Sequence, residues 1–577
     1  MESKDTTNID LIEEEEEIKQ KISKNSCDSQ RKAWIIIVIF CSILIFGIIF
    51  IFIVTNDEGK NYEDNFNYEI IQSDLGYQNV LVNWTFNETF DISINVKGVE
   101  SEIIRTYNIY NTNQGEQLVK VYYGKPKLYI KVIKDGKASI VNKELTIPAK
   151  EILIAAFYAS LPPLMFTLDI FNITSNFNCP IYVALERYKT WNWDNIPERI
   201  LMFDFLDLKN FKIDFNTLLN KMKIWIGQIH QVNSETLFHL FITDYHNFIL
   251  PLCVYSNNIP NENINIYLLS DGVGSFNDFN SKFDNNETYI NTYNELKRKY
   301  AEFKEYIWNQ KRYDKYSSKG KNIRPGDLRY YVYIILKEEK NTYWWLTRIK
   351  GVFVPHNPAL LEELLNNKNI SVKDLNSLFK SLNSTEKKEI KNLLNFNSNY
   401  FEEAYKLNKS IMLFAGTSGS DEKNLIDYCL TAESFYKDDY IYYYKAHPAS
   451  PIENNPKKIE QLKNIKVTPI DSNIPVEVII FFNPKVVCSG YYTSAFIELE
   501  KERLGTVFNQ YKKDDVYFNR FDYFCQYIKK DNEKYGKYLD NNNDGVVLEI
   551  NKNKLIDFKY DFGIYLKNNK SISYFND

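Results

Sequence analysis

Two segments of this chain alternate short apolar strands with helical patterns, and this alternation limits the fold more than any other feature. Strands are predicted at 181–185, 237–242 and 264–269 in the first segment. In the second they are predicted at 411–414, 440–445, 465–467, 478–481 and 485–488. Strands that alternate with helices form parallel sheets, whose ligands bind at the carboxyl ends of the strands. We therefore expect two Rossmann-like units that face a cleft, an N-terminal one at 178–409 and a C-terminal one at 410–513, with residues 514–565 returning to the first.

The region before these units has a different pattern. Residues 75–147 contain short strands of alternating polarity with turns between them, such as Asp135-Gly136. This pattern is typical of a small β-sandwich. Nothing in it suggests catalysis, so we interpret it as an immunoglobulin-like spacer domain.

Residues 33–55 are almost wholly apolar and long enough to cross a bilayer as one helix. Five cations precede this span, whereas only Lys60 follows it closely, so the positive-inside rule predicts a cytosolic N-terminus. We expect a disordered tail at 1–32, a signal anchor at 33–55 and a stem at 56–74. The chain would then be a single-pass type II membrane protein with its folded part in the lumen or outside the cell, and the Golgi is the expected compartment.

Two further observations bear on partners and location. The formal net charge is −5 and no domain is markedly basic, so no nucleic acid is expected as a partner. Eight sequons weakly favour a glycosylating compartment, at Asn83, Asn87, Asn172, Asn286, Asn369, Asn383, Asn408 and Asn569.

Candidate catalytic residues follow predicted strands in both units. Asp271 comes after the strand at 264–269, and His447, held by Pro448, comes after the strand at 440–445. A lone carboxylate is suited to act as a base, and a histidine can donate a proton. Each pattern alone is common in plain turns and loops. Their order on the edges of two α/β units favours a functional role.

A phosphate cradle is the third predicted feature. The turn at Gly416-Thr417 allows a close backbone approach, and the hydroxyls of Thr493 and Ser494 can hold a phosphate at a helix start. One acid, one base and one cradle are the parts needed to transfer a sugar from a nucleotide. The chain has no Asp-x-Asp triplet, which metal-dependent sugar transferases commonly use to hold a divalent ion. We therefore expect a monophosphate donor such as a CMP-sugar, with no cofactor and no metal.

The stretch from about 178 to 510 resembles the bacterial sialyltransferases of glycosyltransferase family 80. Five motifs carry the resemblance: Ser270-Asp271-Gly272, Lys445-Ala446-His447-Pro448, Val476-Glu477-Val478, the pair Thr493 and Ser494, and His246 after an early strand. The resemblance implies a GT-B fold and an inverting, metal-independent transfer of sialic acid from CMP-sialic acid to a galactose-type hydroxyl of a glycan. It also implies site roles. Asp271 would be the general base and His447 the acid, with donor contacts from Gly416, Thr417, Lys445, Pro448, Glu477, Thr493 and Ser494 and an acceptor contact from His246.

Two positions depart from the family pattern. Ser270 replaces an acidic residue, and Ser420 stands where the family has a Trp near donor and acceptor. Two alternatives therefore stay open. The chain could use another CMP-linked nonulosonic acid or Kdo, because the contacts named above all concern CMP. It could also be a membrane-bound glycan-binding protein whose catalytic fold has decayed.

Overall fold

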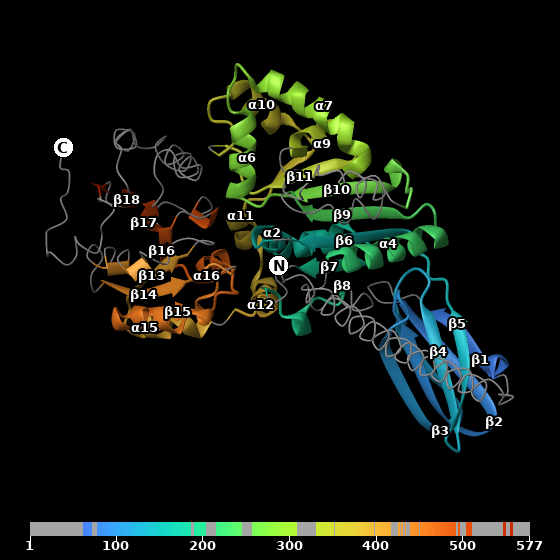
Figure 1. The fold of residues 1–577 in the computed structure, drawn as a ribbon. Helices are drawn as coiled ribbons and strands as arrows, with labels where there is room; N and C mark the ends of the chain where they lie inside the picture. Colours follow the sequence, from blue (N-terminus) through green and yellow to red (C-terminus); the bar gives the residue numbers. More distant parts are fainter. Residues whose placement is uncertain are drawn as a thin grey trace, which may run out of the picture.

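The structure is a computed structural model whose described residues form three β-sheets in chain order (Figure 1). It describes residues 62–71, 78–157, 159–185, 190–202, 215–244, 257–307, 331–350, 352–396, 398–416, 439–448, 450–491 and 494–496, together with short pieces between 425 and 433 and between 503 and 557. The predicted membrane span at 33–55 lies outside these residues. Within the described part, no helix is both long and apolar enough to cross a bilayer.

The N-terminal sheet is antiparallel, as the alternating pattern predicts. Its strands are β1 (Phe66–Ile71), β2 (Gln78–Lys97), β3 (Ile103–Val121), β4 (Lys127–Lys134) and β5 (Lys137–Glu144). The turn Asp135-Gly136 joins β4 to β5 with two positive φ angles, which suit a two-residue hairpin. All five strands hydrogen-bond within one sheet, so the two packed sheets of the expected immunoglobulin-like sandwich are not confirmed.

This sheet is attached to the first α/β unit through the helix α4 (Phe215–Val232). The indole Nε1 of Trp225 donates to the backbone oxygen of Tyr123 at 2.9 Å, and both side chains are buried. Gly124 next to it has a φ of +106°, and a Cβ there would lie 3.2 Å from Gln228. The buried indole and the close backbone approach therefore hold the sheet against α4.

The first α/β unit contains a parallel sheet of seven strands, with the spatial order β12-β11-β10-β9-β6-β7-β8. Counted along the chain this is 3-2-1-4-5-6-7, the Rossmann order with its switch point between β6 and β9. The strands are β6 (Glu151–Phe157), β7 (Ile181–Leu185), β8 (Ile200–Met202), β9 (Leu237–Thr243), β10 (Ile264–Leu269), β11 (Thr342–Leu346) and β12 (Ile370–Val372).

Three of these strands, β7, β9 and β10, confirm the predicted strands of the first unit. The unit begins at β6, before the predicted boundary at 178. The strand β8, around Ile200, is not among the predicted strands.

Helices cover this sheet and link it to the next unit. In Figure 1, α6 (Val273–Phe283), α7 (Tyr289–Ile307), α9 (Val332–Glu338) and α10 (Pro358–Asn366) gather beside β10 and β11, and α4 runs along β6 and β7. Further helices in the described part of this region are α2 (Leu161–Leu168), α3 (Ile170–Asn176), α11 (Leu375–Ser381), α12 (Ser384–Leu393) and α13 (Glu402–Lys406). Asn357, Asp374 and Asn383 cap α10, α11 and α12 by accepting backbone N–H bonds.

The second α/β unit repeats the same strand order. Its sheet runs β15-β14-β13-β16-β17-β18-β19, and the strands β13 to β17 are parallel. They are β13 (Ser410–Ala415), β14 (Tyr440–Lys445), β15 (Val467–Ile470), β16 (Val486–Tyr491) and β17 (Leu504–Asn509). Both units are therefore Rossmann-like, as the sequence predicts. The strands β18 (Val546–Glu549) and β19 (Lys554–Asp557) extend this second sheet in antiparallel fashion.

Two expectations for this unit need correction. The predicted strand at 478–481 belongs to the helix α16 (Val476–Phe482), which starts after Pro475 and buries Val478, Ile479 and Ile480. The return of 514–565 to the first unit is not seen in β18 and β19, which join the second sheet, and most of that segment lies outside the described residues. The ring of Phe481 stacks on Phe379 of α11 at 5.2 Å, so α16 packs against the helices that link the two units.

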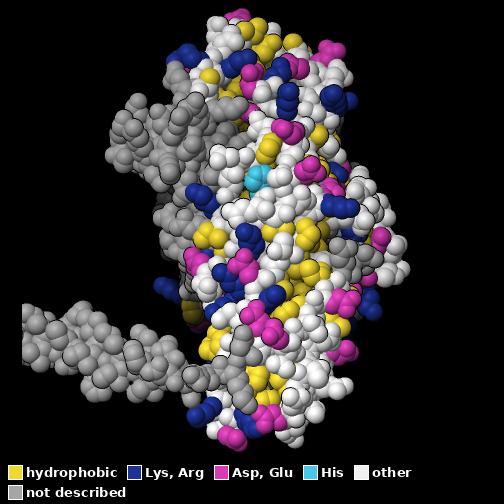
Figure 2. Space-filling model, turned by 90° about the vertical axis from the view of Figure 1, so that its right-hand side faces the viewer, with side chains coloured by type: hydrophobic (Ala, Val, Ile, Leu, Met, Phe, Trp, Pro, Cys, Tyr) yellow, Lys and Arg dark blue, Asp and Glu magenta, His cyan; other side chains and the backbone are white. Residues whose placement is uncertain are grey.

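The face of the molecule shown in Figure 2 is mixed in charge. On the face shown in Figure 2, lysines and arginines alternate with aspartates and glutamates, and no extended patch of one sign is visible.

Candidate functional site

The carboxyl edge of the first sheet carries two aspartates at the ends of neighbouring strands. Thr243 of β9 lies opposite Leu269 of β10, so the chain leaves both strands side by side. Asp244 follows β9 directly, and Asp271 follows β10 after Ser270. The backbone N–H of Asp271 donates to Asp244 Oδ1 at 3.1 Å. The predicted base therefore lies next to a second aspartate, at an edge where α/β sheets bind ligands.

Asp244 is a functional candidate that the sequence analysis missed. It is 4% exposed, and its carboxylate accepts from Ser275 Oγ at 2.7 Å and from Trp344 Nε1 at 2.9 Å as well as from the Asp271 amide. Burial raises the pKa of Asp244 to about 6, and these hydrogen bonds oppose the rise. A buried carboxyl group with a raised pKa at a sheet edge is a candidate functional group. Its one sequence signal is an acidic residue directly after an apolar strand.

The raised pKa of Asp244 predicts a pH-dependent stability. A carboxyl whose folded pKa lies above its unfolded value, here 3.8, stabilises the fold below that value and loses the contribution as the pH rises through about 6. Between about pH 4 and about pH 7, the wild type should lose roughly 2 kcal/mol of unfolding free energy relative to Asp244→Asn. Denaturant unfolding of both proteins at the two pH values measures this. An equal difference at both pH values would contradict the prediction.

Asp271 itself is partly exposed and lies at the start of α6. Gly272, with a φ of +76°, turns the chain from the strand into the helix. The fully buried Ser270 Oγ accepts the N–H of Gly272 at 3.1 Å. Ser270 therefore shapes the turn that presents Asp271, which gives this departure from the family pattern a local structural role.

In the second unit, the predicted glycine turn and the predicted acid meet at the end of β13 and β14. The N–H of Gly416 donates to the backbone oxygen of Lys445 at 2.9 Å. A Cβ on Gly416 would lie 2.7 Å from Tyr444 Oη and 3.3 Å from the backbone nitrogen of His447. Glycine is thus needed for close packing against the His447 segment. His447 is partly buried, and its backbone oxygen accepts the N–H of Ser450 at 2.8 Å, which closes a turn over Pro448.

The end of β16 completes this edge at the switch point of the second sheet. Gly490 pairs with Ala415 of β13 and has a φ of +121°. A Cβ there would lie 2.5 Å from the backbone oxygen of Ala415, so only glycine fits. A short 3₁₀ helix, Ser494–Phe496, follows two residues after β16. Gly490, near the end of β16, therefore lies beside Ala415 at the end of β13.

Lys445 and Glu477 lie buried behind this edge, at 4% and 7% exposure. Burial raises the pKa of the Glu477 carboxyl, while its own backbone N–H and the charge of Lys445 oppose the rise. Glu477 stands in the first turn of α16, where a helix favours a negative charge. A buried carboxylate at this position can accept hydrogen bonds from hydroxyl groups such as those of a ribose.

The structure therefore groups the described candidates in two sets. Asp271 lies with Asp244 on the first sheet, and Gly416, Lys445, His447, Pro448 and Glu477 lie on or next to the edge of the second. His246, Thr417 and Thr493, and the side chain of Ser494, lie outside the described residues. In the part of the chain that is described, no cluster of three or more His, Cys, Asp or Glu side chains is arranged to hold a metal ion.

No family model and no curated protein matches this chain. Similar solved structures include the α/β-galactoside α-2,3-sialyltransferase of Photobacterium phosphoreum, at 17% identity and a TM-score of 0.49, covering 68% of this chain and 97% of that one. The sialyltransferase of Photobacterium damsela is 14% identical, with a TM-score of 0.46, and the match covers 73% of this chain and 90% of that one. A 2,6-sialyltransferase of a Vibrionaceae Photobacterium species was solved with CMP and lactose. It is 15% identical, with a TM-score of 0.46, and the match covers 76% of this chain and 86% of that one. These values describe likeness alone and assign no activity to this chain.

Proposed function

We propose that this chain is an inverting, metal-independent sialyltransferase that uses CMP-sialic acid and a galactose-type acceptor. One observation carries the proposal. Two sheets of the same Rossmann strand order hold the described motif residues at or next to their carboxyl edges. The first sheet carries the carboxylate of Asp271, and the second carries His447, whose backbone packs closely against Gly416. Ligands of such sheets bind at these edges. The motif resemblance of the sequence supports the same assignment.

The proposed reaction is a single displacement at the anomeric carbon of the sialic acid. Asp271 takes the proton of the acceptor hydroxyl as that oxygen forms the new bond from the face opposite the phosphate. The bond from the anomeric carbon to the phosphate oxygen breaks, and the electron pair leaves with CMP. His447 donates a proton to the departing phosphate, which the hydroxyls of Thr493 and Ser494 hold.

The motif resemblance supports the proposed donor and acceptor contacts. Glu477 accepts from the ribose hydroxyls, and Lys445 and Pro448 border the nucleotide. Gly416 and Thr417 let the backbone approach it closely. His246 orients the acceptor sugar. The turn role of Ser270 favours an active enzyme over a decayed glycan-binding protein, because the Ser fits a described hydrogen bond at the proposed base.

Metal independence gives a direct test of this assignment. Transfer should continue in excess EDTA, because His447 rather than a divalent ion neutralises the CMP leaving group. The assay follows CMP release and product formation by the full-length chain in detergent, with and without EDTA. Activity that EDTA abolishes and manganese restores would rule out the proposed leaving-group chemistry.

We further propose that residues 33–55 anchor the enzyme with its folded part in the lumen. The apolar span and the cations before it support this orientation. Alkaline carbonate should leave the protein in the membrane pellet, and protease added outside sealed vesicles should remove only the N-terminal tail. Digestion of the folded part in intact vesicles would reverse the orientation.

A further inference from the structure

The carboxylate of Asp244 lies where β9, β11 and α6 meet, one residue beyond the end of β9. Its Oδ1 accepts from the Asp271 N–H and from Ser275 Oγ, and its Oδ2 accepts from Trp344 Nε1. Ser275 belongs to the first turn of α6, and Trp344 belongs to β11. Because the side chain is buried and both oxygens already accept hydrogen bonds, Asp244 can influence a reaction only through its neighbours.

The Asp271 backbone is held from two sides by this group. Its N–H points at both Asp244 Oδ1, at 3.1 Å, and Ser275 Oγ, at 3.0 Å. The Ser275 hydroxyl in turn donates to Asp244 at 2.7 Å, which closes a three-membered network around one amide. The network fixes the turn 270–272 and the start of α6 relative to β9 and β11. The position of the Asp271 carboxylate follows from that turn.

We propose that Asp244 is the positioning residue for the proposed base, holding Asp271 so that its carboxylate meets the acceptor hydroxyl. The inference rests on the proposed function for the role of Asp271, whereas the anchoring itself is a property of the fold. Accurate placement of a catalytic group contributes strongly to rate, because a misplacement of about 1 Å can cost about 100-fold.

An asparagine cannot replace Asp244 even though it has the same shape. The three partners of Asp244 are all donors, on opposite oxygens of the carboxylate. An amide offers one oxygen and one NH₂ group, so its NH₂ must face either Trp344 Nε1 or the Asp271 N–H. In either orientation the NH₂ group of the asparagine faces another hydrogen-bond donor, so one of these two hydrogen bonds is lost.

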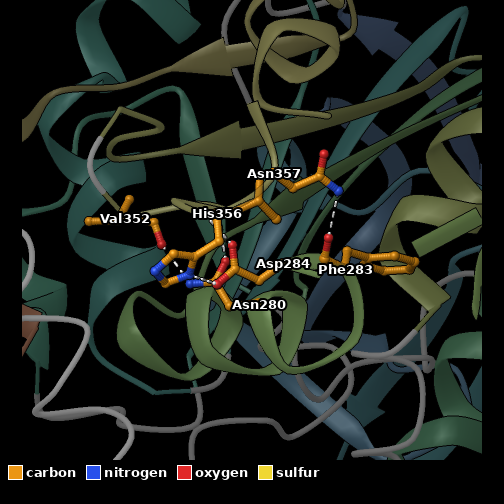
Figure 3. A network of polar contacts seen from close by, with 7 residues as sticks. Asn280, Phe283, Asp284, Val352, His356 and Asn357 are labelled. Atoms are coloured by element: carbon orange, nitrogen blue, oxygen red, sulfur yellow. Dashed lines mark hydrogen bonds and ion pairs between the residues drawn. The ribbon is translucent and has the colours of Figure 1, made fainter. Parts of the chain in front are cut away.

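A matched control lies at the other end of α6. Asp284 is also a buried aspartate, at 6% exposure, and Figure 3 shows it beside His356. Its Oδ1 accepts the backbone N–H of His356 at 2.7 Å, and its Oδ2 lies 2.7 Å from His356 Nδ1. Asp284→Asn therefore disturbs a comparable buried contact on the same helix, about 16 Å along its axis from the Asp271 end.

The experiment compares wild type, Asp244→Asn and Asp284→Asn as full-length chains in detergent. Turnover of CMP-sialic acid with a galactoside gives kcat and the donor KM, and hydrogen–deuterium exchange is followed for peptides over 269–276 and 352–357. We expect Asp244→Asn to lower kcat about 10- to 100-fold, with donor KM changed less than about twofold. Exchange should rise at 269–276 in this variant. In Asp284→Asn it should rise at 352–357, with kcat close to wild type.

The two readouts separate the inference from the function on which it rests. Unchanged exchange at 269–276 in Asp244→Asn, or an equal loss of kcat in both variants, would overturn the positioning role. If Asp244→Asn exchanges faster at 269–276 but none of the three proteins, wild type included, transfers sialic acid, the proposed function is overturned. The anchoring of Asp271 by Asp244 then still holds.

Discussion

Asp271→Asn should lower turnover by about 10²- to 10⁴-fold, the usual size of a lost general base. The amide keeps the shape of the side chain but cannot take the acceptor proton at neutral pH. The backbone N–H of residue 271 still donates to Asp244 and Ser275, so the turn should keep its structure. Steady-state kinetics with CMP-sialic acid and a galactoside measure the loss.

CMP binding supplies the control for this variant. The contacts proposed for the nucleotide all come from the second unit, so the affinity of Asp271→Asn for CMP should match wild type within about twofold, which corresponds to less than 0.5 kcal/mol. A variant that transfers sialic acid as fast as wild type would show that Asp271 has a structural role only. The base would then have to be another group at the carboxyl edge of the first sheet.

His447→Ala should cost a comparable factor, because the leaving phosphate loses its proton donor. The packing of Gly416 against the backbone of this segment does not depend on the imidazole, so the turn should persist. CMP should still bind with modestly reduced affinity if the hydroxyls of Thr493 and Ser494 hold the phosphate. The Asp271→Asn/His447→Ala double variant should lose much less than the product of the two single losses, since residues that act as a unit are non-additive.

His356 provides a matched histidine for comparison. Its side chain is 61% exposed and pairs with Asp284 in the first unit. His356→Ala should therefore keep near wild-type turnover. Equal losses in His447→Ala and His356→Ala would mean that general effects on the protein, rather than proton donation, explain the result.

The strands that sequence patterns predict correctly are short, buried and bounded by clear turns. The strands β7, β9 and β10 are of this kind. In contrast, β6 was missed because its apolar run continues almost directly into the fully buried helix α2, and periodicity cannot divide such a stretch. The helix α16 was predicted as a strand for a related reason. Its run of Val, Ile and Phe has high β-propensity, which tertiary burial overrides.

The candidate site was predictable where a residue type and a strand end coincide. Asp271, Gly416 and His447 each follow a predicted strand after one intervening residue, so their positions at sheet edges could be inferred. The role of Asp244 depends on Trp344, 100 residues further along the chain, and on Ser275. Such contacts are set by the register of β9, β10 and β11, which no local pattern encodes. In the N-terminal region, the pairing of β2 with β4 joins strands that are not consecutive in the chain, and no local pattern encodes this pairing.

The central claim is best tested by product analysis. The full-length chain in detergent is incubated with CMP-sialic acid and a panel of galactosides, with CMP-Kdo as a second donor, and the products are identified by mass spectrometry. We expect one sialic acid residue added to a galactoside, at an anomeric configuration inverted from that of the donor. If the chain binds the donor but releases no CMP and gives no sialylated product with any acceptor, the assignment as a sialyltransferase is contradicted.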